Sequence, residues 1–310
     1  MDDRGKPEVP TTSLLSPAER RLKRAMRREK QRQTNVGRAD KMHQLRVNLE
    51  SGDSVAGPPV ESNKKTQYFI GCSGWFYWKW RGKFYPTELP TSEWLKYYAN
   101  RFDTVEINAS FYSWPTPAGV KAWTRGVARR KFVFTVKVCE LITHVKRFTD
   151  TETLVLDFGK VGDLLEDQMG CFLFQLPPSF NYSPERLKTI LAQLDPRRRN
   201  VMEFRHASWW NEEVFSAFRE TGIIFCSCSA PKLPDALIKT AEDIYIRFHG
   251  KQRWYRHDYT KEELEEWKQR IEASGAKRIW VYFNNDYEAH ATKNARELAR
   301  MLKPKKKNAG

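Results

Sequence analysis

The sequence predicts an α/β protein: a (β/α)8 TIM-type barrel over residues 66–303, preceded by a disordered basic N-terminal extension. Eight short runs of β-branched and aromatic residues recur along residues 66–303. Most gaps between these runs hold a segment with helix-start signals and apolar residues on one face. Strand–helix alternation repeated in this way is the pattern of a closed parallel barrel. The extension is set apart by composition, because no Trp, Tyr or Phe precedes Tyr68.

Residues 1–65 are expected to form a disordered basic arm and linker. They contain 15 Lys and Arg against 9 Asp and Glu, and they offer too little apolar surface to offset the entropy of ordering. Within them, residues 18–33 carry eight basic and two acidic residues, and Leu22 and Met26 form only a thin apolar stripe. This stretch is expected to be a transient helix at most. Residues 304–310 are expected to form a basic C-terminal tail.

The eight predicted strands are short and apolar, as expected for strands buried on both faces. In chain order they are Tyr68–Cys72, Thr104–Ile107, Phe132–Val138, Cys171–Leu176, Asn200–Phe204, Ile223–Ser227, Asp243–Phe248 and Ile279–Phe283. An open doubly wound sheet is the alternative architecture. No predicted strand is followed by a G-x-G-x-x-G or P-loop motif, which disfavours that alternative.

Helix-start signals lie in the gaps between the strands, as N-cap residues, as Ser or Thr before Pro, or as a capping box. They are Ser92, Thr116-Pro117, Ser183-Pro184, Ser208 and the pair Thr260 and Glu263. Residues 229–242 are the weak gap, because Pro231 and Pro234 leave room only for a stub of helix.

The five cysteines form no C-x-x-C pair, and the N-terminal residues contain no apolar leader segment. The absence of a disulfide framework indicates reduced thiols. No stretch of 18 uncharged apolar residues is present, so the sequence predicts neither export nor a membrane span. A cytoplasmic location is expected, and the sequence indicates no oligomeric state.

Polar side chains accumulate where the predicted strands end. In a TIM barrel alternate strand residues point into the lumen, and sites form at the carboxyl ends of the strands. The polar residues at these inward positions are Glu106, Asn108, Lys137, Gln175, Glu203, Arg205, Tyr245, Arg247, His249, Tyr282, Asn284 and Asp286. Each charge among them must be paired or solvated to avoid a large desolvation cost.

Two interpretations of these charges stay open. In the first, Glu106 and Glu203 neutralise Lys137, Arg205 and Arg247 in a structural layer that closes the barrel. In the second, the charges form an anion-binding pocket that performs acid/base chemistry. The expected substrate of this pocket is a small phosphorylated molecule.

The second interpretation assigns roles to individual residues. Glu106 or Glu203 is the candidate general base, and His249 is the candidate proton carrier. Lys137, if desolvated, is a candidate base or Schiff-base former. Substrate binding falls to Arg205 and Arg247, which suit phosphate or carboxylate, and to Trp75, Tyr77, Asn108, Gln175, Tyr282 and Asn284.

A resident metal is not expected. Glu106, Glu203, His249 and Asp286 could surround a divalent cation, but the neighbouring Lys and Arg residues oppose one. The sequence indicates no cofactor.

A nucleic-acid-binding or nucleic-acid-processing protein is the alternative function. The chain has a net charge of +16, and residues 18–33 could contact phosphates. Residues 75–85 mix aromatic and basic residues, among them Trp75 and Tyr77, which suits the stacking of bases. The same rings could instead plug the top of the barrel and order a long loop.

Seven motifs in order resemble the YecE-like family, a bacterial and archaeal domain of unknown function. They are Gly71-Cys72-Ser73-Gly74-Trp75, Thr104-Val105-Glu106-Ile107-Asn108, Ile142-Thr143-His144, Phe174-Gln175-Leu176-Pro177-Pro178, Glu203-Phe204-Arg205-His206, Arg247-Phe248-His249-Gly250 and Phe283-Asn284-Asn285-Asp286. The resemblance covers residues 68–302 and implies a TIM-type barrel, without a settled reaction, substrate or cofactor. Residues 1–65 lie outside it.

Overall fold

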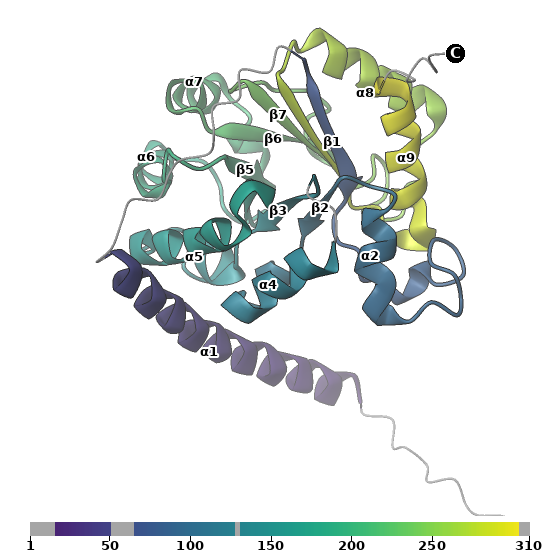
Figure 1. Ribbon diagram of the computed structural model, residues 1–310. Helices are drawn as coiled ribbons and strands as arrows, with labels where there is room; N and C mark the ends of the chain where they lie inside the picture. The colour runs from purple at the N-terminus through teal and green to yellow at the C-terminus, as the bar shows by residue number, and fades with distance from the viewer. Residues whose placement is uncertain (1–15, 51–64, 128–130, 304–310) are drawn as a thin grey trace, which may run out of the picture.

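The computed structural model describes residues 16–50, 65–127 and 131–303, and it confirms the predicted barrel. Eight parallel strands surround a common axis and helices cover their outer side (Figure 1). The strand order is β1-β8-β7-β6-β5-β4-β3-β2. The ring is completed between β1 and β2 by an isolated bridge that pairs Ser73 with Glu106. The strands are β1 (Gln67–Cys72), β2 (Thr104–Ile107), β3 (Val133–Lys137), β4 (Met169–Leu176), β5 (Asn200–Phe204), β6 (Ile224–Ser229), β7 (Asp243–Phe248) and β8 (Arg278–Phe283).

Helices precede the barrel and follow most of its strands. The α-helices are α1 (Pro17–Glu50), α2 (Trp94–Ala99), α3 (Ala109–Tyr112), α4 (Pro117–Gly126), α5 (Glu152–Leu165), α6 (Pro184–Gln193), α7 (Glu212–Thr221), α8 (Lys261–Ala273) and α9 (His290–Leu302). The short helices are η1 (Trp78–Trp80), η2 (Thr91–Glu93), η3 (Leu141–Val145, a π-helix), η4 (Glu166–Gln168), η5 (Ala207–Trp209) and η6 (Tyr287–Ala289). None of the described helices is long and apolar enough to cross a membrane.

Most helix starts follow the sequence signals. The side chains of Thr116 and Ser183 accept the expected backbone N–H groups, and Thr260 and Glu263 form the capping box of α8. The Ser208 signal is wrong for α7, because Ser208 lies in the preceding short helix and Asn211 caps α7 instead. The Ser92 signal is wrong for α2 in the same way, since Ser92 lies within η2 and Glu93 occupies the N-cap position.

The stub of helix expected between strands six and seven is absent, since residues 230–242 contain no helix. Hydrogen bonds of the Thr240 side chain attach this segment to the start of β6. The Thr240 hydroxyl donates to the carbonyl of Ile223 at 2.6 Å and accepts the N–H of Phe225 at 2.9 Å. These bonds satisfy backbone groups at the start of β6 and fix the segment beside that strand.

The lower half of the lumen is filled by apolar and aromatic side chains. Phe69 stacks on Trp280 with ring centroids 4.0 Å apart. Above them, the Tyr282 hydroxyl lies 2.7 Å from the hydroxyl of Thr104 and 2.8 Å from that of Thr135. This packing restricts any site in the lumen to its carboxyl end, as in other TIM barrels.

The expectation of a disordered arm is corrected for residues 17–50, which form one 34-residue helix, α1. Its C-terminal half packs on α5 (Figure 1), where Ala39 and Met42 are each 1% exposed. Asn35 binds the backbone of Tyr112 at the end of α3 and of Trp114 just after it, and Arg46 pairs with Asp157 at 2.7 Å. Tertiary contacts of this kind stabilise helices whose own apolar stripe is thin. The remaining residues of the predicted arm and the tail of residues 304–310 lie outside the described residues.

Candidate active site at the barrel mouth

A chain of buried ion pairs crosses the carboxyl end of the lumen, which we call the barrel mouth. Arg247, near the end of β7, donates from Nη2 to Glu106 and from Nη1 to Glu203, each at 2.5 Å. Glu203 also pairs with Arg205. The side chains of Glu106, Glu203 and Arg247 are at most 1% exposed. Parallel strands end at the same edge of the barrel, and this brings residues from β2, β5 and β7 into contact.

Arg205 and Arg247 keep the buried carboxyl group of Glu203 ionised. Burial alone would raise its pKa, but Arg205 and Arg247 outweigh that effect and hold the pKa well below its usual range. Glu203 is therefore ionised throughout the neutral range and is a weak base.

Arg247 has an environment different from the one expected for a substrate-binding residue. Both of its terminal nitrogens are occupied by carboxylates, and its side chain is closed to solvent. Its Nε has no partner among the described residues. The structural layer foreseen as one interpretation is thus present in the Glu106–Arg247–Glu203 pairs.

Lys137 is the cation that this layer does not neutralise. Its ammonium donates to Gln175 Oε1 at 2.6 Å and lies 4.0 Å from the ring centroid of Phe111. Within the described part of the chain it forms no ion pair, although the expected layer included one. Burial first, and then the positive charges of Arg247 and Arg205, lower the Lys137 pKa to about 7.

His249 completes the buried cluster. Its Nε2 lies 3.1 Å from Arg205 Nη2 and 3.3 Å from Glu203 Oε1, and its Nδ1 lies 3.1 Å from Asn284 Nδ2. Burial and the two arginines hold the His249 pKa well below its usual range. The imidazole is therefore neutral at pH 7 and suits a hydrogen-bonding role better than the expected role of proton carrier.

Other expected site residues are only partly brought to the mouth. Asn108 donates to the carbonyl of Ser73 at 3.2 Å and is half-buried, and Asn284 is half-buried beside His249. Tyr282 lies one layer deeper, bound to Thr104 and Thr135, and is 0% exposed. The alternation along β8 placed Tyr282 correctly inside the lumen but did not show its depth.

The loop after β1 is ordered by its own rings. The Tyr77 hydroxyl donates to the carbonyl of Ser73 at 2.5 Å, and the Trp75 carbonyl accepts the Tyr85 hydroxyl at 2.5 Å. Trp80 is 0% exposed and its ring lies 4.7 Å from that of Tyr77. This loop mainly packs against the barrel, so most of its rings are not free to stack on bases.

Three neighbours of the cluster were not assigned a role in the expected site. The Tyr245 hydroxyl donates to Glu106 at 2.5 Å, and the Trp254 ring lies 4.5 Å from the Arg205 guanidinium carbon. Ser73 bridges to Glu106 and lies 3.4 Å from Arg247 Nη2. Tyr245 shares the inward face of β7 with Arg247, a spacing that could have singled it out. No local signal points to Trp254, which comes from the loop after β7.

One group of potential metal ligands lies in the described chain. The ligand atoms of Glu203, Cys226 and Cys228 lie within 4.8 Å of one another. Burial raises the Cys226 pKa well above its usual range, and Arg205 and Arg247 add positive charge beside the group. Burial therefore opposes the thiolates that a soft cation would need, and the two arginine charges oppose the cation itself.

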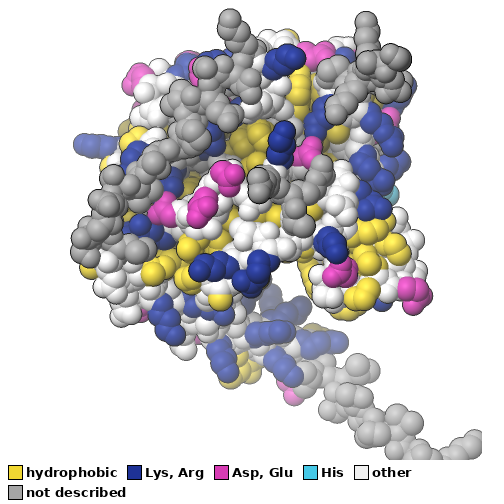
Figure 2. All heavy atoms as spheres, in the orientation of Figure 1, with side chains coloured by type: hydrophobic (Ala, Val, Ile, Leu, Met, Phe, Trp, Pro, Cys, Tyr) yellow, Lys and Arg dark blue, Asp and Glu magenta, His cyan; other side chains and the backbone are white. Residues whose placement is uncertain are grey.

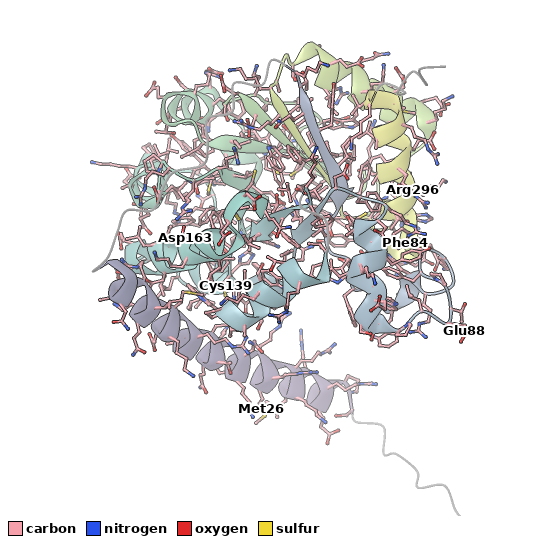
Figure 3. All side chains as sticks on the ribbon, viewed as in Figure 1. Met26, Phe84, Glu88, Cys139, Asp163 and Arg296 are labelled. Carbon is pink, nitrogen blue, oxygen red and sulfur yellow. The ribbon has the colours of Figure 1, made fainter. Side chains whose placement is uncertain are left out.

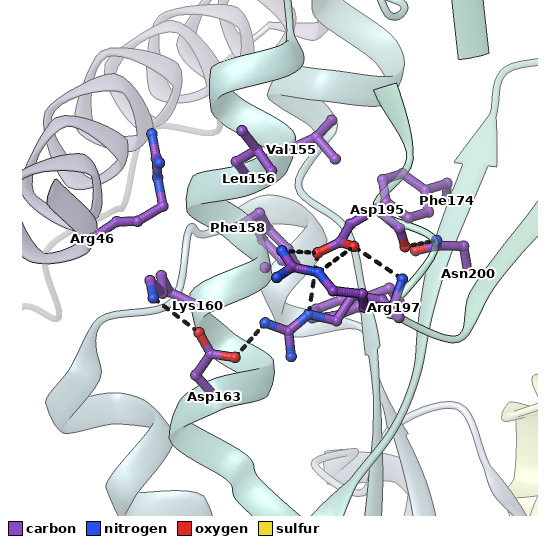
Figure 4. Close-up of a pocket in the computed structure, with 13 residues that line it drawn as sticks. Arg46, Val155, Leu156, Phe158, Lys160, Asp163, Phe174, Asp195, Arg197 and Asn200 are labelled. Atoms are coloured by element: carbon purple, nitrogen blue, oxygen red, sulfur yellow. Dashed lines mark hydrogen bonds and ion pairs between the residues drawn. The ribbon is translucent and has the colours of Figure 1, made fainter. Parts of the chain in front are cut away.

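A hollow of about 300 Å³ lies outside the barrel, between α1, α5 and the start of β5 (Figure 4). Its charged side chains all lie in ion pairs; they are Arg46, Lys160, Asp163, Asp195, Arg197 and Arg198. Lys160 pairs with Asp163 at 3.1 Å, and Arg197 pairs with Asp195 at 2.9 Å. Because these charges are paired and partly solvated, the barrel mouth is the better candidate site.

Residues 69–309 match the family described as "Protein of unknown function DUF72". The chain belongs to the DUF72 family. The match confirms that the chain belongs to a family of unknown function, and the narrower YecE-like relationship stays a prediction.

Three relatives are similar to this chain over most of their length. The UPF0759 protein YunF of Bacillus subtilis is 27% identical over 270 residues, which cover 76% of this chain and 94% of that protein. A crystal structure of a DUF72 family protein from Thermotoga maritima is 30% identical with a TM-score of 0.69, covering 76% of this chain and 99% of that one. A DUF72 family protein from Enterococcus faecalis, 18% identical with a TM-score of 0.66, covers 76% of this chain and 95% of its own and shares the fold.

Proposed function

We propose that the barrel mouth is the active site of an enzyme that acts by acid/base or amine chemistry on a small anionic substrate. The observation that carries this proposal is the state of Lys137. Its pKa of about 7 leaves about half of the molecules with a neutral amine at neutral pH. A neutral buried amine is a base and a nucleophile, whereas an ordinary lysine is neither at this pH.

The surrounding charges support this role for Lys137. The two glutamates hold Arg247 and Arg205 in place, and these cations disfavour a second positive charge on Lys137. Glu106 and Glu203 remain the other candidate bases, and the low pKa of Glu203 makes that carboxylate a weak base.

An anionic substrate suits the groups of the buried cluster that keep a small part of their surface exposed. Lys137 and Gln175 are 8% and 9% exposed, and the side chain of Arg205 is 10% exposed. These groups, with Asn108 and Asn284, are the ones placed to meet a phosphate or carboxylate entering from solvent. Arg247 is more deeply buried than these groups and holds Glu203 in place through an ion pair.

The five cysteines are buried free thiols, which suits a reducing compartment. A cytoplasmic location is therefore part of the proposal. The narrower YecE-like relationship, supported by the seven motifs of the sequence, is also kept as a proposal.

Competitive labelling of lysines tests the state of Lys137 without knowledge of the substrate. An acylating reagent is applied to the full chain between about pH 6 and 10, and Lys137 acylation is followed by mass spectrometry. We expect acylation to rise with a midpoint near pH 7. Lys160 is the control, since it is 7% exposed but paired with Asp163. A Lys137 midpoint above about pH 9, near the value of a free lysine, would contradict the proposal.

Thermal-shift measurements test whether a small anion binds at the barrel mouth. A panel of inorganic phosphate, phosphorylated sugars and nucleotides is expected to include a ligand that stabilises the wild type. The same ligand should lose its effect in Lys137→Met and in Arg205→Gln, and keep it in Lys160→Met. A shift that survives Lys137→Met and Arg205→Gln places the anion elsewhere and refutes the site.

A further inference from the structure

The N-terminal half of α1 extends beyond the part of the helix that packs on the barrel. Every residue from Ser16 to Lys30 is exposed, whereas Asn35, Ala39 and Met42 are buried. Figure 1 shows this half of α1 continuing past α4, away from the α5 contact. Residues 17–34 of the helix span about 27 Å.

The face of α1 that packs on the barrel continues into the projecting half as a row of arginines. Helical phase places Arg21, Arg24 and Arg28 on the side that carries Asn35 and Met42 two to six turns later. We call this the arginine face, and its residues are Arg20, Arg21, Arg24, Arg27 and Arg28.

The opposite face of the projecting half has a different composition. Leu22 and Met26 are 63% and 65% exposed, and Met26 points away from the barrel in Figure 3. The two acidic residues of this half, Glu19 and Glu29, share that outer side. Positive charge is therefore concentrated on the inner side of the helix.

None of the arginines of the arginine face forms an ion pair with another described residue. Figure 2 shows Lys and Arg side chains gathered along α1. A row of unpaired guanidiniums on one helix face produces a positive potential that only an external anion can offset. The regular one-turn spacing suits a repeating anion better than a single one.

The arginine face leads to the rim of the barrel mouth. Asn35 donates to the carbonyl of Tyr112 at 3.1 Å and accepts the N–H of Trp114 at 3.0 Å, at the end of α3 and just after it. Burial first, and then Tyr255 from the loop after β7, raise the Tyr112 pKa, and the positive charge of Arg28 acts in the opposite direction. Tyr112 and Tyr255 are 59% and 42% exposed. Exposed rings thus lie where the row of arginines meets the mouth.

We propose that the arginine face binds the phosphate backbone of a single-stranded nucleic acid, with bases stacking on exposed rings at the rim of the mouth. Backbone phosphates are the repeating anion that a row of forked guanidiniums matches. Aromatic rings beside such a row bind bases without regard to sequence. An acidic peptide would use the arginines alone and would leave Tyr112 and Tyr255 without a role.

The chain offers a matched control for charge. Arg21, Arg24 and Arg28 lie on the arginine face, whereas Lys23, Lys30 and Lys41 lie on the other side of the same helix and are exposed. Glutamine keeps helix propensity close to that of Arg and Lys. The triple variants R21Q/R24Q/R28Q and K23Q/K30Q/K41Q therefore remove equal charge from opposite sides of one helix.

The test is fluorescence anisotropy of the full chain with a labelled single-stranded RNA of about 20 nucleotides, at several salt concentrations. We expect salt-dependent binding that R21Q/R24Q/R28Q weakens at least about 10-fold, with the salt slope reduced by about 2. The variant K23Q/K30Q/K41Q should change affinity less than about 3-fold, and Tyr112→Ala should weaken binding without changing the salt slope.

Three outcomes overturn the proposal: no binding, equal weakening by both triple variants, or stronger binding to a polyglutamate peptide than to the RNA. The second shows a general effect of net charge, and the third an acidic protein partner. Lys137→Met is expected to leave RNA binding unchanged. The arginine face can therefore fail while the active-site proposal survives, and the reverse also holds.

Discussion

Replacing Arg247 with Met removes the cation that joins the two buried glutamates of the barrel mouth. In the wild type Arg247 lies 2.5 Å from both Glu106 and Glu203. Glu203 keeps Arg205 as a partner after the change, whereas Glu106 keeps only the hydroxyl of Tyr245. The main consequence is an unpaired buried carboxylate at Glu106.

The cost follows from the burial of the pair. Removing one partner of a fully buried ion pair typically costs about 3–5 kcal/mol, because the remaining charge stays desolvated. For a domain of this size the loss corresponds to a fall in Tm of about 6–20 °C. Glu106→Gln added to Arg247→Met removes the unpaired charge, so the double variant should be more stable than Arg247→Met alone.

Chemical denaturation at pH 7 measures these free energies of unfolding. Arg278→Met is the control, because Arg278 pairs with Asp243 at 2.8 Å but is 24% exposed. We expect the control to lose roughly 1 kcal/mol. A loss below about 1 kcal/mol in Arg247→Met, or a double variant less stable than the single one, would show that the pair is not desolvated as described and refute the reasoning.

Two further predictions concern pH and the docking of α1. The pKa of His249 is held well below its usual range and that of His144 is lowered to about 4, in both cases mainly by burial, so the unfolded state binds more protons below about pH 6.5 and stability falls from there towards pH 4. Denaturation at pH 7 and 5 should show a smaller fall in His144→Gln/His249→Gln, and an unchanged fall would contradict the assignment. Met42→Ala should reduce hydrogen-exchange protection of α1 by about 30-fold, since Met42 is 1% exposed and its truncation costs about 2 kcal/mol or more. Val47→Ala, at a residue that is 49% exposed, should change protection little; equal effects of the two variants would place the docking contact elsewhere.

The sequence by itself determined the barrel and the identity of the mouth residues. Eight strand runs and their alternation suffice for this, because side chains along a strand have a period of two and parallel strands end at one edge. Glu106, Glu203 and Arg247 were placed on inward positions by that rule, and the structure brings them together. The capping box of Thr260 and Glu263 was also predicted from the sequence, because it depends only on residues three positions apart.

Only the tertiary structure decided what these residues do to one another. The rule of alternation does not give depth, so it could not distinguish Tyr282 in the core from Lys137 near solvent. It does not give partners either. Arg247 pairs with two glutamates, whereas Lys137 bonds only to the neutral side chain of Gln175 among the described residues. Arg247 is therefore a positioning residue, and Lys137 is the candidate base. The order of α1 was likewise decided by contacts such as Asn35 with Tyr112, which join residues 77 positions apart. Pairing, depth and docking depend on distances between segments remote in sequence, and local composition and periodicity carry no information about those distances.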